Sequence, residues 1–344
     1  MTPATRVAIM TGVETTSIED RMLRPLDRGE VLVRVASVGV CGSDVHWYRD
    51  GRIGDTVVTD PLVLGHEASG TITEVGAGVD PSRVGTRVAI EPGIPCRECD
   101  QCSAGRYNLC PFVRFFATPP VDGAFATHVI TQDAFAHAVP DSLTDDEAAL
   151  IEPLSVAVWA NRAGRVSLGD RVLVTGAGPI GLLVLQVARS SGAVVTVTDI
   201  SDDRLALASE LGADRTVNAS TPSDADRYDV LIECSGAASA IDSGIRALAP
   251  AGRAVLVGMA ASASVAVPLD VIQSRELQIT GTFRYANVYP AAIHLAASGR
   301  VQLTRLVTSV HDLDHVDDAL MASSRDPLAL KSIVRPQAQE SPSA

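Results

Sequence analysis

A thiol, an imidazole and a carboxylate that could bind one metal ion lie close together in the first third of the chain. Cys41, His66 and Glu67 fall within 27 positions, and glycines near them let the backbone turn tightly. Three protein ligands with a fourth position left for water or substrate are typical of a catalytic zinc ion. Each residue taken alone is more often a buried thiol, a core histidine or a surface charge. Together with the two motifs described next, they predict a catalytic zinc site.

Four of the six cysteines form a second cluster at short spacings. Four thiolates in one loop make a closed tetrahedral zinc site, which is structural rather than catalytic. An iron–sulfur cluster is the alternative. Bacterial ferredoxin spacing, however, ends with three residues between the last two cysteines and then a proline, whereas seven residues intervene here. We therefore predict a structural zinc ion bound by Cys96, Cys99, Cys102 and Cys110.

A glycine-rich turn in the middle of the chain predicts a dinucleotide site. The sequence G-A-G-P-I-G at 176–181 follows an apolar strand-like run at 171–175 and opens an apolar stretch at 182–188. In that context a G-x-G-x-x-G motif lets the backbone and the helix N-terminus approach a pyrophosphate. The predicted cofactor contacts in this turn are Gly176, Gly178, Pro179, Ile180 and Gly181.

The choice of cofactor depends on Asp199, which ends the next strand, 23 residues after Gly176. A carboxylate at this position binds the hydroxyls of the adenosine ribose. It would repel a 2′-phosphate, and the adjacent Ile200 and Ser201 offer no positive charge to receive one. Arg204, five residues on, can brace the adenosine end instead. The sequence therefore predicts NAD rather than NADP.

Composition excludes several other functions. A chain of 344 residues predicts two domains, and a net charge of −13 disfavours nucleic acids and anionic membranes as partners. Lys331 is the only lysine, which argues against a catalytic lysine or a Schiff base. The uncharged stretch 172–188 is interrupted by glycine and proline, so it predicts a strand, a turn and a helix rather than a membrane span. The chain start lacks a basic-then-apolar signal pattern, so we expect a cytoplasmic protein.

The pattern of residues changes near position 170. Before it, short alternating or β-branched runs predict a bent β-rich domain. After it, strands at 171–175, 194–198, 230–234, 254–257 and 277–282 alternate with helices, as in a doubly wound parallel sheet. A helix at 290–298 follows. We expect a helix at 314–323 and a strand at 330–334 to fold back onto the first domain, and 337–344 to form a loose tail.

Glu152 is a single carboxylate in an apolar run. Thr144 and Glu147 form a capping-box pattern that predicts a helix start, and Pro153 is expected to break or kink that helix just after Glu152. A carboxylate buried in such a run needs a partner, which a metal ion or a water on a metal ion would supply. The alternative is a helix-end carboxylate that reaches solvent, and the sequence leaves both open.

The chain resembles the zinc-dependent medium-chain alcohol dehydrogenases, in particular the sorbitol, xylitol and related polyol dehydrogenase branch. The resemblance runs from about residue 10 to about residue 334 and rests on many separate motifs in the same order. These motifs are 38–46, 51–54, 63–71, 105–110, 117–120, 150–156, 176–181 and 283–285.

This resemblance implies an α/β fold in which a GroES-like, β-rich catalytic domain (1–152 and 288–344) accompanies a Rossmann domain (153–287). It implies a homo-oligomer, with a tetramer favoured over a dimer. It also implies one catalytic zinc on Cys41, His66 and Glu67, with Glu152 on or beside the water bound to that zinc. Which of the two glutamates is the third protein ligand stays open.

The same resemblance assigns further site residues. Ser43 and His46 match the hydroxyl and imidazole that carry the alcohol proton towards solvent. Additional contacts to NAD are expected at Val257, Gly258, Met259, Thr282, Phe283 and Arg284. Contacts to the polyol are expected at Trp47, Glu152, Arg284 and Tyr285.

Two departures from the branch concern the substrate pocket and the cysteine lobe. Relatives have His-Tyr-Trp where this chain has His46-Trp47-Tyr48, which alters the aromatic face of the pocket. The four-cysteine lobe is complete, whereas animal sorbitol dehydrogenases have lost it, which indicates a microbial type of enzyme. We predict reversible oxidation of a secondary hydroxyl of a sugar alcohol to a ketose. The alternatives are a zinc dehydrogenase for a simple alcohol, threonine or a diol such as butanediol, and a non-catalytic NAD-binding protein.

Overall fold

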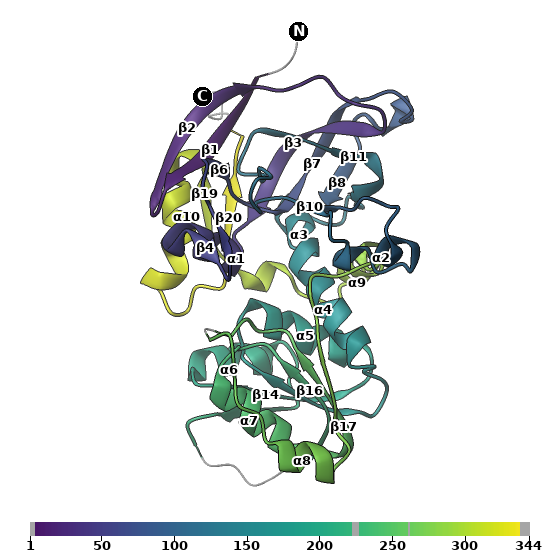
Figure 1. The fold of residues 1–344 in the computed structure, drawn as a ribbon, viewed down its shortest axis with the longest axis vertical. Helices are drawn as coiled ribbons and strands as arrows, with labels where there is room; N and C mark the ends of the chain where they lie inside the picture. The colour runs from purple at the N-terminus through teal and green to yellow at the C-terminus, as the bar shows by residue number, and fades with distance from the viewer. Residues whose placement is uncertain (1–3, 222–226, 261, 338–344) are drawn as a thin grey trace. The chain divides into compact units, whose positions relative to one another are not determined.

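The computed structural model describes residues 4–221, 227–260 and 262–337 (Figure 1). The chain divides into two compact units. Unit 1 comprises Met1–Glu152 and Leu303–Ala344, and unit 2 comprises Pro153–Gln302. None of the helices described has the length and apolar composition that a membrane span needs.

Unit 1 is built on a seven-stranded sheet in which chain-distant segments are neighbours. Its order is β12-β8-β7-β3-β20-β19, and β11 also pairs with β3. Valines that recur at alternate positions of β3, such as Val31, Val33 and Val35, are fully buried, as the β-branched pattern requires. The strands are β3 (Glu30–Gly39), β7 (Glu67–Val75), β8 (Arg87–Ile90), β11 (His128–Gln132), β12 (Ala136–Ala138), β19 (Val307–Asp312) and β20 (Lys331–Arg335).

Smaller elements complete unit 1. A three-stranded sheet has the order β2-β1-β6, and two-stranded pairs form between β4 and β5 and between β9 and β10. The strands are β1 (Ala4–Gly12), β2 (Thr15–Met22), β4 (Arg52–Ile53), β5 (Thr56–Val57), β6 (Leu62–Val63), β9 (Gly93–Ile94) and β10 (Arg114–Phe115). The helices are α1 (Gly42–Asp50), α2 (Asp100–Ser103), α3 (Asp145–Ala149) and α10 (Val316–Arg325).

Unit 2 is a six-stranded parallel sheet of order β15-β14-β13-β16-β17-β18. The strands are β13 (Arg171–Thr175), β14 (Val194–Asp199), β15 (Arg215–Asn218), β16 (Tyr228–Glu233), β17 (Leu248–Leu256) and β18 (Gln278–Gly281). The strand order reverses between β13 and β16, and ligands of open parallel sheets bind at the carboxyl edge of such a switch point. The helices are α4 (Ile151–Ala163), α5 (Pro179–Ser190), α6 (Asp202–Glu210), α7 (Ala238–Arg246), α8 (Leu269–Ser274) and α9 (Tyr289–Ala297).

The structure places the second boundary between the units at Gln302, so residues 288–302 lie in unit 2 and not, as expected, in the first domain. Side-chain contacts explain the difference. The Tyr289 ring packs on Tyr285 with centroids 5.7 Å apart. The N–H of Gln302 donates to Oε1 of Gln186 at 2.7 Å.

Two local predictions are wrong. The helix break lies at Leu150 and not after Glu152, because α3 ends at Ala149 and α4 begins at Ile151. Pro153 then stands in the first turn of α4, where its missing N–H has no helical partner to lose. The expected loose tail does not begin at Gln337, whose side-chain amide donates to two backbone carbonyls at 2.8 and 2.7 Å. The rest of that tail lies outside the described residues.

Candidate metal and cofactor sites

The structure brings Cys41, His66 and Glu67 together within unit 1, with one ligand atom of each lying within 4.8 Å of the others. Cys41 is the N-cap of α1, and Glu67 is the first residue of β7. The antiparallel register pairs Glu67 with Gly39, near the end of β3, which leads directly into Cys41. Sheet pairing therefore brings together Cys41 and Glu67, which are 26 residues apart in sequence.

The donor set fits a divalent cation. Glu67 is fully buried, and its Oε2 has no hydrogen-bond partner among the described residues. A buried carboxylate oxygen without a partner is costly, and a cation beside a thiol and an imidazole would satisfy it. Only glycine leaves room there, since a Cβ on Gly39 would lie 2.2 Å from Oε2. The thiolate, imidazole and carboxylate donors match the ligand types that zinc prefers.

Lys331 is the partner of the other Glu67 oxygen. Its ammonium forms an ion pair with Oε1 and donates to the carbonyl of Val40 at 3.1 Å. Burial by itself disfavours the ammonium. The charges of Glu67 and Cys41 outweigh that effect and hold the pKa of Lys331 above its usual value. The lone lysine thus contacts a predicted zinc ligand, a role that sequence reasoning missed although the residue stands in a strand-like run.

Asp44 is a second residue that sequence reasoning missed. Its buried carboxylate accepts the N–H of Cys41 at 3.0 Å and the N–H of Gly65 at 2.9 Å, and lies 3.5 Å from Nδ1 of His66. Burial would raise the pKa of Asp44, but His66 and these donors outweigh it and lower that pKa. Burial would likewise lower the pKa of His66, yet Asp44 and the Cys41 thiolate raise it well above its usual value. The three-residue spacing from Cys41 to Asp44, a helix-start pattern, was the available signal.

Glu152 is 5% exposed, so it is a buried carboxylate and not a helix end that reaches solvent. It is not one of the three residues whose donor atoms converge within 4.8 Å. Its negative charge nevertheless contributes to the raised pKa of Lys331. The structure therefore brings Glu152 into the electrostatic surroundings of the cluster without making it a member.

Helix α1 carries the predicted proton-relay residues. Ser43 is half-buried. His46 is exposed, and its Nδ1 lies 3.0 Å from Oδ2 of Asp50, one helical turn away. Trp47, predicted to contact substrate, is 4% exposed and packs in the hydrophobic core of unit 1. The ring of Phe115, another residue that sequence reasoning did not single out, lies 5.6 Å from that of His66.

The four-cysteine cluster forms as predicted from its spacing. The Sγ atoms of Cys96, Cys99, Cys102 and Cys110 all lie within 4.8 Å of one another. Without a metal ion, the backbone N–H groups of Glu98 and Cys99 lower the pKa of Cys96 to about 7, whereas burial and the Cys99 thiol raise the pKa of Cys102 to about 12. Four converging thiols with no place for a fifth ligand fit a structural zinc ion.

The glycine-rich turn of unit 2 links β13 to α5. Gly176 has φ +92°, Gly178 is the N-cap of α5, and Pro179 begins the helix beside Ile180. Gly181 cannot carry a side chain, because a Cβ would lie 1.8 Å from the carbonyl oxygen of Gly176. The turn therefore leaves the backbone bare at the helix N-terminus, as close approach of a pyrophosphate requires.

Asp199 ends β14 beside this turn. Its Oδ2 accepts the N–H of Ala177 at 2.6 Å, and its Oδ1 accepts the N–H of Ser201 at 2.9 Å. A carboxylate has about four lone-pair positions, so it can still accept ribose hydroxyls. The guanidinium of Arg204 lies 3.9 Å from the position of a Cβ built on Gly178. The structure thus brings Asp199 and Arg204 to the same turn.

The other predicted cofactor residues follow the carboxyl ends of β17 and β18. The N–H groups of Val257 and Gly258 donate to the carbonyl of Glu233 at 2.8 and 3.0 Å, and Met259 is exposed. The N–H of Thr282 donates to the carbonyl of Leu256 at 3.0 Å.

Phe283 is exposed, and the guanidinium of Arg284 lies 4.7 Å from its ring centroid. Tyr285, predicted to contact substrate, is 3% exposed and packs against Tyr289. Sequence reasoning missed Glu233 at the switch point. Its fully buried carboxylate accepts hydrogen bonds from Ser235, at N and Oγ, and from two other residues.

Comparison with known proteins identifies the family. Residues 27–141 match the model of the alcohol dehydrogenase GroES-like domain, and residues 179–298 match the model of the zinc-binding dehydrogenase. Sorbitol dehydrogenase of Bacillus subtilis (strain 168) is 39% identical over 325 residues, which cover 92% of each chain. The chain belongs to the zinc-binding alcohol dehydrogenase family.

Further relatives agree with this family. Sorbitol dehydrogenase of Homo sapiens is 46% identical over 302 residues, which cover 84% of each chain. Among solved structures, L-idonate 5-dehydrogenase of Escherichia coli is 27% identical with a TM-score of 0.92, over 98% of this chain and 99% of that one. Membership confirms the predicted fold class, a GroES-like domain plus a doubly wound parallel sheet. It also confirms the prediction that the protein is an oxidoreductase.

Proposed function

We propose that this chain is a zinc- and NAD-dependent polyol dehydrogenase, which oxidises a secondary hydroxyl of a sugar alcohol to the corresponding ketose and runs in reverse. The observation that carries the proposal is the convergence of Cys41, His66 and the unpartnered Oε2 of Glu67. The relatives named sorbitol dehydrogenase support a polyol as the substrate class.

In this reaction the alcohol carbon loses a hydride and its oxygen loses a proton. A zinc ion held by Cys41, His66 and Glu67 supplies Lewis acidity, which lowers the pKa of an alcohol from about 16 towards neutrality. NAD held at the glycine-rich turn and Asp199 would supply the hydride acceptor. The protein must then position the hydroxyl and carry its proton away.

Residues of unit 1 can carry the alcohol proton to solvent. The Ser43 hydroxyl can accept it and pass it to His46, whose exposed imidazole can release it to water. Asp50 holds Nδ1 of His46 and so leaves Nε2 for exchange. The buried carboxylate of Glu152 orients the substrate hydroxyl as a hydrogen-bond acceptor. Trp47, Arg284 and Tyr285 are the proposed polyol contacts, of which Trp47 and Tyr285 can offer only small exposed edges.

The oligomeric state and location are part of the same proposal. We infer a homo-oligomer, with a tetramer favoured. All four residues of β18, the last strand of its sheet, are exposed, and an open strand edge is a template for pairing with a second copy. A cytoplasmic location is supported by cysteines that are grouped as metal ligands rather than as disulfide pairs.

The proposal is tested by NADH production with C4 to C6 polyols, simple alcohols, threonine and 2,3-butanediol, run alongside a zinc count per chain. We expect the highest kcat/KM with a polyol, NAD strongly preferred over NADP, and two zinc ions per chain. Higher kcat/KM with butanediol or threonine would reassign the substrate. Absence of turnover with every alcohol in a zinc-loaded protein would overturn the proposal.

A further inference from the structure

Four polar side chains form a row across the seven-stranded sheet of unit 1, one from each of four adjacent strands. Ser37 of β3 pairs in register with Ser69 of β7, and both are buried. Arg335 of β20 follows Val334, which pairs with the residue after Ser37. Arg87 of β8 completes the series, since β8 pairs with β7. We call Arg335, Ser37, Ser69 and Arg87 the polar row.

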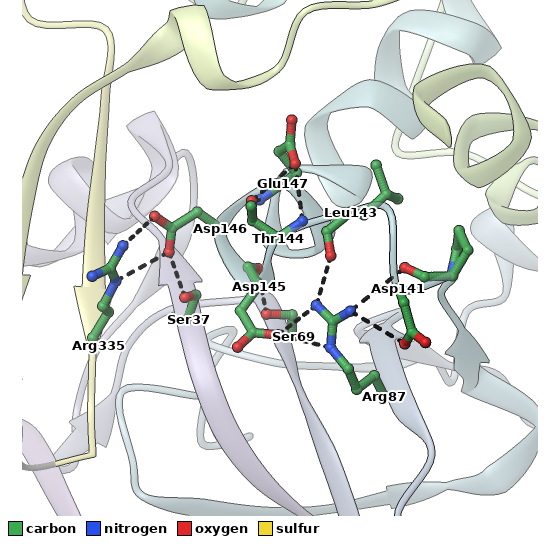
Figure 2. Close-up of polar contacts among 11 residues, drawn as sticks. Ser37, Ser69, Arg87, Asp141, Leu143, Thr144, Asp145, Asp146, Glu147 and Arg335 are labelled. Atoms are coloured by element: carbon green, nitrogen blue, oxygen red, sulfur yellow. Dashed lines mark hydrogen bonds and ion pairs between the residues drawn. The ribbon is translucent and has the colours of Figure 1, made fainter. Parts of the chain in front are cut away.

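The polar row binds the first turn of α3. Figure 2 shows the Asp146 carboxylate between Arg335 and Ser37, with Nη2 of Arg335 at 2.7 Å and Oγ of Ser37 at 2.6 Å. The next two contacts are to Asp145. Its carbonyl accepts Oγ of Ser69 at 2.6 Å, and its carboxylate accepts Nη2 of Arg87 at 2.7 Å. Every member of the row therefore holds the same helical turn.

These contacts hold the start of α3, and the buried Leu150 and Ile151 anchor the chain just after it. Helix α3 has five residues, and a helix so short is not stable in isolation. Its buried residues are Ala148 and Ala149, which offer little apolar surface. The Asp146 side chain is 14% exposed and the Arg335 side chain is 45% exposed, so their ion pair is partly open to water.

The predicted zinc ligand Glu67 and its register partner Gly39 lie on two strands of the polar row. Glu67 precedes Ser69 on β7 by two residues, and Gly39 follows Ser37 on β3 by two. Side chains two apart on a strand share a face and lie about 7 Å from each other. On β20, Lys331 and Arg335 are four residues apart and share that face too.

Strand β20 thus holds the start of the segment that runs from Asp146 to Glu152. Arg335 binds Asp146, and only six residues separate Asp146 from the buried Glu152. We propose that the polar row is a positioning device that fixes the start of α3 and thereby sets where Glu152 lies relative to Glu67. This inference rests on the proposed function, in which Glu152 orients the substrate hydroxyl.

Asp146→Asn tests the inference because it keeps the shape of the side chain and removes its charge. We expect kcat to fall about 10-fold, since displacing a catalytic group by about 1 Å can cost up to 100-fold. The KM of the polyol should change less than about twofold. The pH dependence of kcat should shift, and two zinc ions per chain should remain. Ser37→Ala, which keeps the ion pair and removes one hydrogen bond, should give a smaller change in the same direction.

A double-mutant cycle separates positioning from general stability. If Asp146 acts through Glu152, then Asp146→Asn added to Glu152→Gln should lower kcat by less than about twofold further. Catalytic-site Co²⁺ substitution gives a readout besides activity. The pH-dependent visible absorption of the Co²⁺ enzyme should shift in Asp146→Asn and in Glu152→Gln, with no further shift in the double variant.

Asp133→Asn is the matched control, because Asp133 forms an ion pair with Arg83 at 2.7 Å in the same unit but away from α3. It should leave kcat and the Co²⁺ spectrum unchanged. Fully additive losses from Asp146→Asn and Glu152→Gln would overturn the inference while leaving the proposed function intact. If Glu152→Gln alone has normal kcat, the catalytic role of Glu152 in the proposed function fails, and the inference fails with it.

Discussion

Replacing Lys331 by methionine would remove one partner of a fully buried ion pair. Side-chain exposures of 4% for Lys331 and 0% for Glu67 leave water unable to solvate the remaining carboxylate. Breaking such a pair costs about 3–5 kcal/mol, because an uncompensated charge stays buried. At about 2–4 °C per kcal/mol for a unit of this size, the melting temperature of the metal-free protein should fall by roughly 6–20 °C.

The assay is calorimetry or fluorescence-monitored unfolding in the presence of a chelator and again with excess zinc. A cation on Glu67 replaces the lost positive charge, so zinc should stabilise Lys331→Met more than it stabilises the wild type. In the metal-free state, adding Glu67→Gln to Lys331→Met should recover most of the lost stability, since the carboxylate that needed a partner is gone. A metal-free Lys331→Met protein as stable as the wild type would refute this reasoning, as would a double variant no more stable than Lys331→Met.

Four further predictions concern the two zinc sites and the cofactor. Cys99→Ser should lower stability while the folded enzyme keeps near-normal kcat; a folded variant that retains two zinc ions but is inactive would contradict this. Asp199→Ala should lower kcat/KM for NAD by an amount equivalent to roughly 1.5–3 kcal/mol for each ribose hydrogen bond lost. Substantial use of NADP by the wild type would argue against the assignment. Glu152→Gln should lower kcat by about 10–100-fold with both zinc ions retained; loss of the catalytic zinc, measured by metal analysis, would make Glu152 a ligand. The pKa of His66 is raised in the metal-free protein, so zinc must displace a proton when it binds. Zinc affinity should therefore rise with pH, and the binding enthalpy measured by calorimetry should depend on the buffer. A zinc affinity that does not change with pH would contradict this prediction.

Parts of the candidate sites could be read from the sequence because their geometry is local. The four cysteines lie within 15 positions, so a single loop suffices to bring their thiols together. The turn at Gly176 and the helix start at Thr144 likewise depend only on nearby backbone. The sequence did not predict strand β15. Its four residues are too few to show a strand pattern, and its position at the edge of the sheet leaves it half-exposed.

What the sequence alone determined about this protein is its chemistry: the donor types of two metal sites, the glycine-rich turn, the carboxylate at Asp199 and the alternation of strands and helices. Only the tertiary structure decided which charges meet. Lys331 and Glu67 form an ion pair although they are 264 residues apart in sequence, and Arg335 and Asp146 do so at a separation of 189 residues. No local sequence pattern predicts either pair. Such pairs depend on which strands are neighbours and in what register, and that is settled by packing of the whole unit, because shifting one strand by one residue would turn its side chains to the opposite face.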